Sequence, residues 1–148
     1  MSLPTPGGYS FTAVLADEQA TEALMRDIAA LIEPGDLITL SGDLGAGKTT
    51  FARSFIRHIA GNDAVEVPSP TFTLMQVYEL PRFTLLHADL YRLHDAREID
   101  ELGLFDRPDA IVLVEWAERA PELFARATLR VALSIPADGI GRLAEISR

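Results

Sequence analysis

The stretch "LITLSGDLGAGKTTFARSF" (residues 37–55) decides the fold, because it joins an apolar run to a glycine-rich turn and then to a helical pattern. Residues 37–40 are uniformly apolar apart from one threonine, which is typical of a short strand buried on both faces. Phe51, Phe55 and Ile59 recur at helical spacing, so a helix is expected after Gly47. This order of strand, turn and helix predicts an α/β fold.

The rest of the chain continues the alternation of strands and helices. Residues 9–16 alternate as a strand, and Asp17 is placed to cap a helix. That helix is expected over residues 18–32, with an apolar face made by Ala20, Leu24, Ile28 and Leu31. Further along, the patterns predict an antiparallel pair at residues 71–80 and 83–91, a short acidic helix at 94–105, a buried strand at 110–116, and two strands within 127–147 around the turn 136–139.

These elements predict one domain over residues 1–148, of which residues 1–8 are expected to be flexible. The expected architecture is a three-layer P-loop NTPase-like sandwich with a mixed, largely parallel central sheet and antiparallel additions.

Composition and charge narrow the classes of function. The 148 residues contain no cysteine, so disulfides, thiolate-bound zinc and a catalytic thiol are excluded. No apolar run approaches the roughly 20 residues of a membrane span, and a cytoplasmic protein is expected. A formal net charge of −9 argues against direct binding of nucleic acid, because phosphate backbones recruit Lys and Arg.

The basic residues are divided unevenly, since the chain has twelve arginines and a single lysine, Lys48. That lysine lies in "GDLGAGKT" (residues 42–49), which satisfies the P-loop pattern of Gly, four residues, Gly, Lys and Ser or Thr. In this pattern, glycines let backbone amides approach phosphate oxygens, and the following helix adds its positive end. The residues expected to bind the nucleotide phosphates are Gly42, Asp43, Leu44, Gly45, Ala46, Gly47, Lys48, Thr49 and Thr50.

The expected cofactors are ATP and Mg²⁺. ATP is favoured because the N-K-x-D element of guanine-selective P-loop proteins needs a second lysine, which this chain lacks. The Thr49 hydroxyl is placed to ligate Mg²⁺, and Glu115 supplies the carboxylate that a P-loop site needs at the end of a neighbouring strand. Asp89 is the second candidate, for orienting the attacking water or for the metal shell. Which of the two carboxylates ligates the metal directly stays open, and His87 is interpreted as a strand-end histidine more readily than as a proton carrier.

Three further residues are candidates by position. Ser69 and Thr71, in "VPSPTFT" (residues 67–73), are close enough in sequence to reach the γ-phosphate side, although the two prolines also suit a rigid connection. Trp116 follows Glu115 and suits either core packing or contact with the nucleotide.

Four motifs in order, "GDLGAGKTTFAR", "SPTFTLMQVYE", "HADLYRL" and "VEWAE", together resemble the TsaE family (also called YjeE) over nearly the whole chain. The resemblance implies a weak ATPase that associates with the TsaB–TsaD pair, in which TsaD transfers a threonylcarbamoyl group to adenosine of tRNA. It also implies that Lys48, Asp89 and Glu115 act in catalysis, that Thr49, Glu115 and Asp89 serve the metal, and that Trp116 neighbours the site. The tRNA would be held by the partner, in agreement with the acidic composition.

Two other functions fit the same pattern. A small-molecule kinase also uses strand, P-loop and helix at this length, although no lid insertion is evident. A nucleotide-gated interaction module without useful hydrolysis is the third hypothesis. The acidic stretch at residues 94–106 suits either a solvated face or a docking surface.

Overall fold

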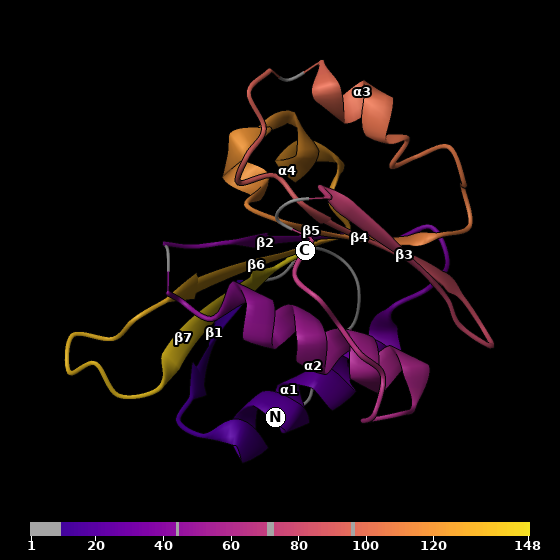
Figure 1. Cartoon of the computed structure of the whole chain (residues 1–148). Coiled ribbons are helices and arrows are strands. Elements are labelled where there is room, and N and C mark those ends of the chain that lie inside the picture. The colour runs from indigo at the N-terminus through magenta and orange to yellow at the C-terminus, as the bar shows by residue number, and fades with distance from the viewer. Residues whose placement is uncertain (1–9, 44, 71–72, 96) are drawn as a thin grey trace.

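The computed structural model describes residues 10–43, 45–70, 73–95 and 97–148. The flexible segment expected at residues 1–8 lies outside them. In chain order the elements are β1 (Ser10–Leu15), α1 (Glu18–Leu31), β2 (Leu37–Ser41), α2 (Lys48–Ala60), β3 (Met75–Glu79), β4 (Thr84–Asp89), α3 (Glu98–Leu102), β5 (Ile111–Glu115), the 3₁₀ turn η1 (Ala117–Arg119), α4 (Glu122–Arg126), β6 (Leu129–Ser134) and β7 (Arg142–Ser147) (Figure 1).

A seven-stranded sheet in the order β1-β7-β6-β2-β5-β4-β3 forms the centre of the molecule. Its four inner strands, β6, β2, β5 and β4, are parallel, while β3 pairs antiparallel at one edge and β7 and β1 at the other. The predicted mixed α/β sheet with antiparallel additions is confirmed. The sheet is largely parallel only at its centre, because β1 returns to pair with β7 and extends the antiparallel edge.

Helices cover both faces of the sheet. Figure 1 shows α1 and α2 against one face and α3 and α4 against the other. The strand pleat divides each inner strand between the two layers. In β5, Ile111 and Leu113 join the core under α1 and α2, whereas Val112 and Val114 join the core on the α3 and α4 side.

The two long helices begin where the sequence predicts, and α1 ends one residue before its expected end. The Asp17 side chain accepts a hydrogen bond of 2.9 Å from the Ala20 amide and so caps α1. Phe51 and Phe55 of α2 are buried, and Gly61 ends that helix with a φ of 64°.

The segments on the other face differ more from the prediction. The acidic helix expected at residues 94–105 is only Glu98–Leu102, because Gly103 takes a left-handed φ of 66° and ends it. The strands of the predicted antiparallel pair begin later than expected, at Met75 and Thr84. Neither η1 nor α4 was predicted, since segments of three and five residues are too short to show a helical period.

Candidate functional site

The glycine-rich turn joins the carboxyl end of β2 to the first residue of α2. Gly42 has a φ of 141°, and a Cβ placed there would lie 2.3 Å from the carbonyl oxygen of Leu133. Gly47 precedes α2 with a φ of 98°, and no side chain caps the helix. Because the first amides of a helix have no partner within it, this end of α2 presents N–H groups and a positive dipole to the turn.

The geometry at Gly42 predicts that Gly42→Ala destabilises the fold more than Gly45→Ala does. At Gly45 the φ of 84° is also left-handed, but an added Cβ meets nothing within 4 Å. We expect Gly45→Ala to cost about 1–2 kcal/mol from backbone strain, and Gly42→Ala to cost roughly 1–3 kcal/mol more from overpacking against backbone. Urea unfolding of both variants without nucleotide measures the difference, and equal midpoints would contradict it.

Lys48 is the first residue of α2, and its side chain is buried, with 5% of its surface exposed. Its Nζ donates hydrogen bonds to the carbonyl oxygens of Gly42 and, at 2.9 Å, Asp43. The ammonium lies 3.9 Å from the centre of the Trp116 ring. Burial lowers the pKa of Lys48, and the negative charges of Glu118, Glu115, Asp43 and Asp89 oppose that shift. The turn therefore encloses an ammonium group that is surrounded by carboxylates.

Glu115 ends β5 beside the turn and is 1% exposed. The Thr49 hydroxyl donates to its Oε1 over 3.2 Å, although the two residues are 66 positions apart. The parallel pairing of β2 with β5 places Leu40 opposite Glu115 and so brings the carboxylate to the start of α2. The structure thus joins two of the three residues that the sequence proposes for a metal.

Asp89, the third, ends β4 opposite Glu115 in the sheet register. It is 3% exposed, and its Oδ1 accepts a hydrogen bond of 2.9 Å from the Tyr91 amide. Trp116 adopts a φ of 58°, which is uncommon outside glycine, and its ring centre lies 4.9 Å from that of Tyr91. The Trp116 ring therefore lies between the ammonium of Lys48 and the ring of Tyr91 in the chain of contacts.

The remaining predicted residues differ in their exposure to solvent. Ala46 is buried, whereas Asp43, Gly45 and Thr50 are exposed on the turn and the first turn of α2. Ser69 is exposed in the irregular segment before β3. Leu44 and Thr71 lie outside the described residues.

Three residues that contact this site were not among the predicted site residues, although His87 was considered as a proton carrier and judged more typical of a strand end. His87 Nε2 lies 2.5 Å from Glu115 Oε2, Glu118 Oε2 accepts a 3.0 Å bond from the Gly42 amide, and Arg142 Nη2 donates over 3.2 Å to the Gly45 carbonyl. Two of the three lie in quoted motifs, since His87 begins "HADLYRL" and Glu118 ends "VEWAE". The contacts of His87 and Arg142 arise from strand pairing and carry no local pattern.

With this geometry described, comparison with known proteins identifies the family. A family model described as threonylcarbamoyl adenosine biosynthesis protein TsaE matches residues 15–142. The chain belongs to the TsaE family. Proteins of that name act in the biosynthesis of threonylcarbamoyladenosine in tRNA, as their description states.

Individual TsaE proteins support this over most of the chain. The TsaE protein of Rickettsia felis is 39% identical over 123 residues, covering 82% of this chain and 71% of the relative. That of Bacillus subtilis is 37% identical over 122 residues, covering 81% and 75%. The crystal structure of Bacillus subtilis YdiB superposes with a TM-score of 0.69 at 26% identity, covering 97% of this chain and 88% of YdiB.

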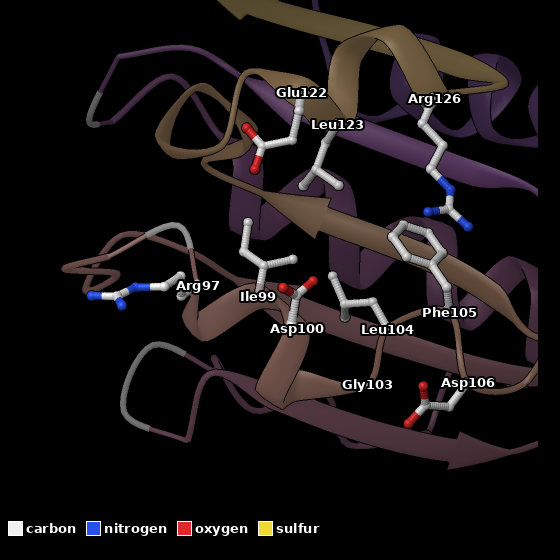
Figure 2. Close-up of a pocket in the computed structure, with 10 residues that line it drawn as sticks. All are labelled: Arg97, Ile99, Asp100, Gly103, Leu104, Phe105, Asp106, Glu122, Leu123 and Arg126. Carbon is white, nitrogen blue, oxygen red and sulfur yellow. The ribbon is translucent and has the colours of Figure 1, made fainter.

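Two cavities of this TsaE family member differ in their relation to the site. The larger, about 750 Å³, lies between α4 and α3 with its following loop, and Figure 2 shows Arg126 over the ring of Phe105 at one end. It contains none of the predicted site residues. A cavity of about 290 Å³ adjoins the turn, and Ala46, Gly47, Thr50 and Arg142 are among its lining residues. Of these two cavities, only the smaller is lined by predicted site residues.

The described part of this TsaE chain contains no group of three or more His, Asp or Glu residues arranged to hold a metal ion. No helix in that part is long and apolar enough to cross a lipid bilayer. A metal at this site would therefore need ligands beyond Thr49 and the carboxylates.

Proposed function

We propose that this chain is a P-loop ATPase, which binds Mg²⁺ and ATP at residues 42–50 and hydrolyses ATP slowly. The observation that carries the proposal is the buried ammonium of Lys48, enclosed by the turn at the start of an uncapped helix. A buried ammonium is stable only with charged or hydrogen-bonding partners, and here its bonded partners are the carbonyls of Gly42 and Asp43. A phosphate would supply the negative charge that these carbonyls lack.

The turn suits phosphate for a second reason. Gly45 and Gly47 have positive φ angles, and a Cβ at either position would enter open space, so the backbone there is accessible to a ligand. Consecutive amides near a helix start form the usual protein site for phosphate. Several charge-assisted bonds of roughly 1.5–3 kcal/mol each would support micromolar nucleotide affinity after desolvation and ordering costs.

The residues present also fit Mg²⁺. Thr49 and Glu115 offer hard oxygen ligands, which Mg²⁺ prefers, and it takes its remaining ligands from water and phosphate oxygens. This agrees with the small number of protein ligands in the described site. Four carboxylates act on the single ammonium of Lys48. A divalent cation would therefore also offset the repulsion between these carboxylates and the triphosphate.

We assign the base to the cavity of about 290 Å³ beside the turn. Leu15 and Phe51 give it apolar walls, and Thr50 and Arg142 give it polar groups. Its volume lies near the lower bound of about 300 Å³ for small-molecule sites, as expected for a pocket that holds only part of the ligand.

The proposed mechanism relies on positioning and electrostatics. A bound Mg²⁺ would supply positive charge that stabilises the transferred phosphoryl group. Lys48 and the amides of the turn would hold the β- and γ-phosphates, and Thr49 with Glu115 would hold the ion. The carboxylate of Asp89 orients the attacking water and accepts its proton.

Proteins of the TsaE family act in the biosynthesis of threonylcarbamoyladenosine in tRNA, and we propose that the ATPase of this chain supports turnover of a TsaB–TsaD complex in the cytoplasm. The net charge of −9 supports indirect contact with tRNA, through the partners. The acidic stretch at residues 94–106, some of whose residues line the cavity between α3 and α4, stays a candidate docking surface.

Phosphate release during a titration of the purified chain with ATP and Mg²⁺ tests the proposal, with and without the TsaB–TsaD pair. We expect slow release alone and an increase of at least about 10-fold with the pair, as for other partner-stimulated P-loop enzymes. Phosphate transferred to a metabolite would support the kinase hypothesis instead. ATP bound but never cleaved would support the interaction module.

A further inference from the structure

His87 contacts Glu115 at a place where the sequence predicted no role for it. It lies on β4 and is completely buried, and its Nε2 is 2.5 Å from Glu115 Oε2. Side chains two residues apart on a strand share a face, so His87 and Asp89 both point to the α1 and α2 side of the sheet, where Glu115 also lies. Parallel pairing of β4 with β5 brings the histidine and the glutamate together.

Only one of the two ring nitrogens of His87 has a hydrogen-bond partner among the described residues. Nδ1 is buried and has no hydrogen-bond partner among the described residues. A proton on Nδ1 would therefore be an unsatisfied buried donor, which is costly, so the proton belongs on Nε2, which donates to the carboxylate. The Nε2–H of His87 is thus directed at Glu115.

This contact leaves the two oxygens of Glu115 with different partners. Oε2 accepts from His87, and Oε1 accepts from the Thr49 hydroxyl over 3.2 Å. The terminal torsion of a glutamate is broad, so one hydrogen bond alone does not fix the plane of its carboxylate. One hydrogen bond to each oxygen does fix the plane of the carboxylate, and Oε1 then faces the threonine proposed to ligate Mg²⁺.

We propose that His87 is a positioning residue, which orients Glu115 so that Oε1 and the Thr49 hydroxyl together receive the Mg²⁺ of the bound nucleotide. The inference rests on the proposed function, because it assigns a residue to that same metal. Groups that hold metal ligands in place typically contribute 10–100-fold to metal affinity without touching the ion.

Three substitutions separate orientation from packing. His87→Gln places an amide nitrogen as far along the side chain as Nε2 and can still donate to Oε2. His87→Asn is shorter and cannot reach that oxygen, and His87→Leu fills the space without a donor. The Gln and Asn variants carry the same amide group, so each is the matched control for the other.

The test uses Mn²⁺ as a spin probe in place of Mg²⁺. Electron paramagnetic resonance measures free Mn²⁺ during titration of the full chain with ADP present, and ADP binding in EDTA is measured separately. We expect the Mn²⁺ dissociation constant to rise about 10-fold or more in His87→Asn and His87→Leu, and to stay within about 3-fold in His87→Gln. ADP affinity in EDTA should stay within about 2-fold in all three, because the hydrogen bond of His87 is to Glu115 and not to the glycine-rich turn.

Each outcome is decisive. If His87→Leu fails to fold, the Gln and Asn pair gives the answer alone. Equal Mn²⁺ affinity in His87→Gln and His87→Asn would overturn the positioning role while the proposed function stands. The same holds if a variant loses ADP affinity in EDTA by as large a factor as it loses Mn²⁺ affinity. A wild-type chain that binds no nucleotide would overturn the proposed function and this inference with it.

Discussion

Replacing Lys48 by alanine is expected to lower ATP affinity at least ~100-fold and to reduce hydrolysis to background. Each charge-assisted contact to a phosphate oxygen is worth roughly 1.5–3 kcal/mol, so its loss raises the dissociation constant by about 10–150-fold. Lys48 is the chain's single lysine, and no neighbouring ammonium can replace it. Calorimetric titration with ATP and Mg²⁺ measures the affinity, and phosphate release measures the rate.

Two further substitutions at Lys48 separate charge from packing. Lys48→Met keeps an unbranched apolar stem beside Trp116 and should lose binding as alanine does. Lys48→Arg keeps the charge, but the planar guanidinium does not match a pocket that holds a single Nζ between two carbonyl oxygens. We therefore expect this variant to bind ATP weakly. ATP affinity close to wild type in Lys48→Met would show that the ammonium does not hold the phosphates.

Asp89→Asn is expected to slow ATP cleavage about 10²–10³-fold, as removal of a general base does, while ATP affinity changes by less than about 3-fold. The amide oxygen of asparagine can still accept the bond from the Tyr91 amide, so the end of β4 should keep its conformation. Single-turnover cleavage at saturating ATP gives the rate, and equilibrium titration gives the affinity.

Asp100→Asn is the matched control, because Asp100 is an exposed carboxylate on α3 outside the site. It should leave both the rate and the affinity unchanged. Equal losses of rate and affinity in Asp89→Asn would assign Asp89 to nucleotide binding and contradict its role towards the attacking water.

The central part of the fold could be predicted because its signals are local. The apolar run of β2, the glycines of the turn and the spacing of Phe51 and Phe55 each report a structure within a few residues. The order of the strands could not be predicted, because pairing such as that of β1 with β7 joins opposite ends of the chain. The five-residue helix α4 escaped prediction because it is shorter than two helical turns.

The same division applies to the candidate site. Lys48, Thr49 and Glu115 follow from the P-loop pattern and from a carboxylate at the end of a buried strand, and the structure brings them together. His87 is 28 residues from Glu115, and nothing near it in the sequence reveals the contact that strand pairing creates. Arg142 reaches Gly45 across 97 residues in the same way.

The most direct test of the central claim is a crystal structure of the chain grown with ADP and Mg²⁺. We expect phosphate groups within hydrogen-bonding distance, about 3 Å, of the backbone amides of Gly45, Gly47 and Lys48, with the Lys48 ammonium turned from the Gly42 carbonyl towards them. Nucleotide bound elsewhere, for example in the groove between α3 and α4, with the turn unchanged, would contradict it.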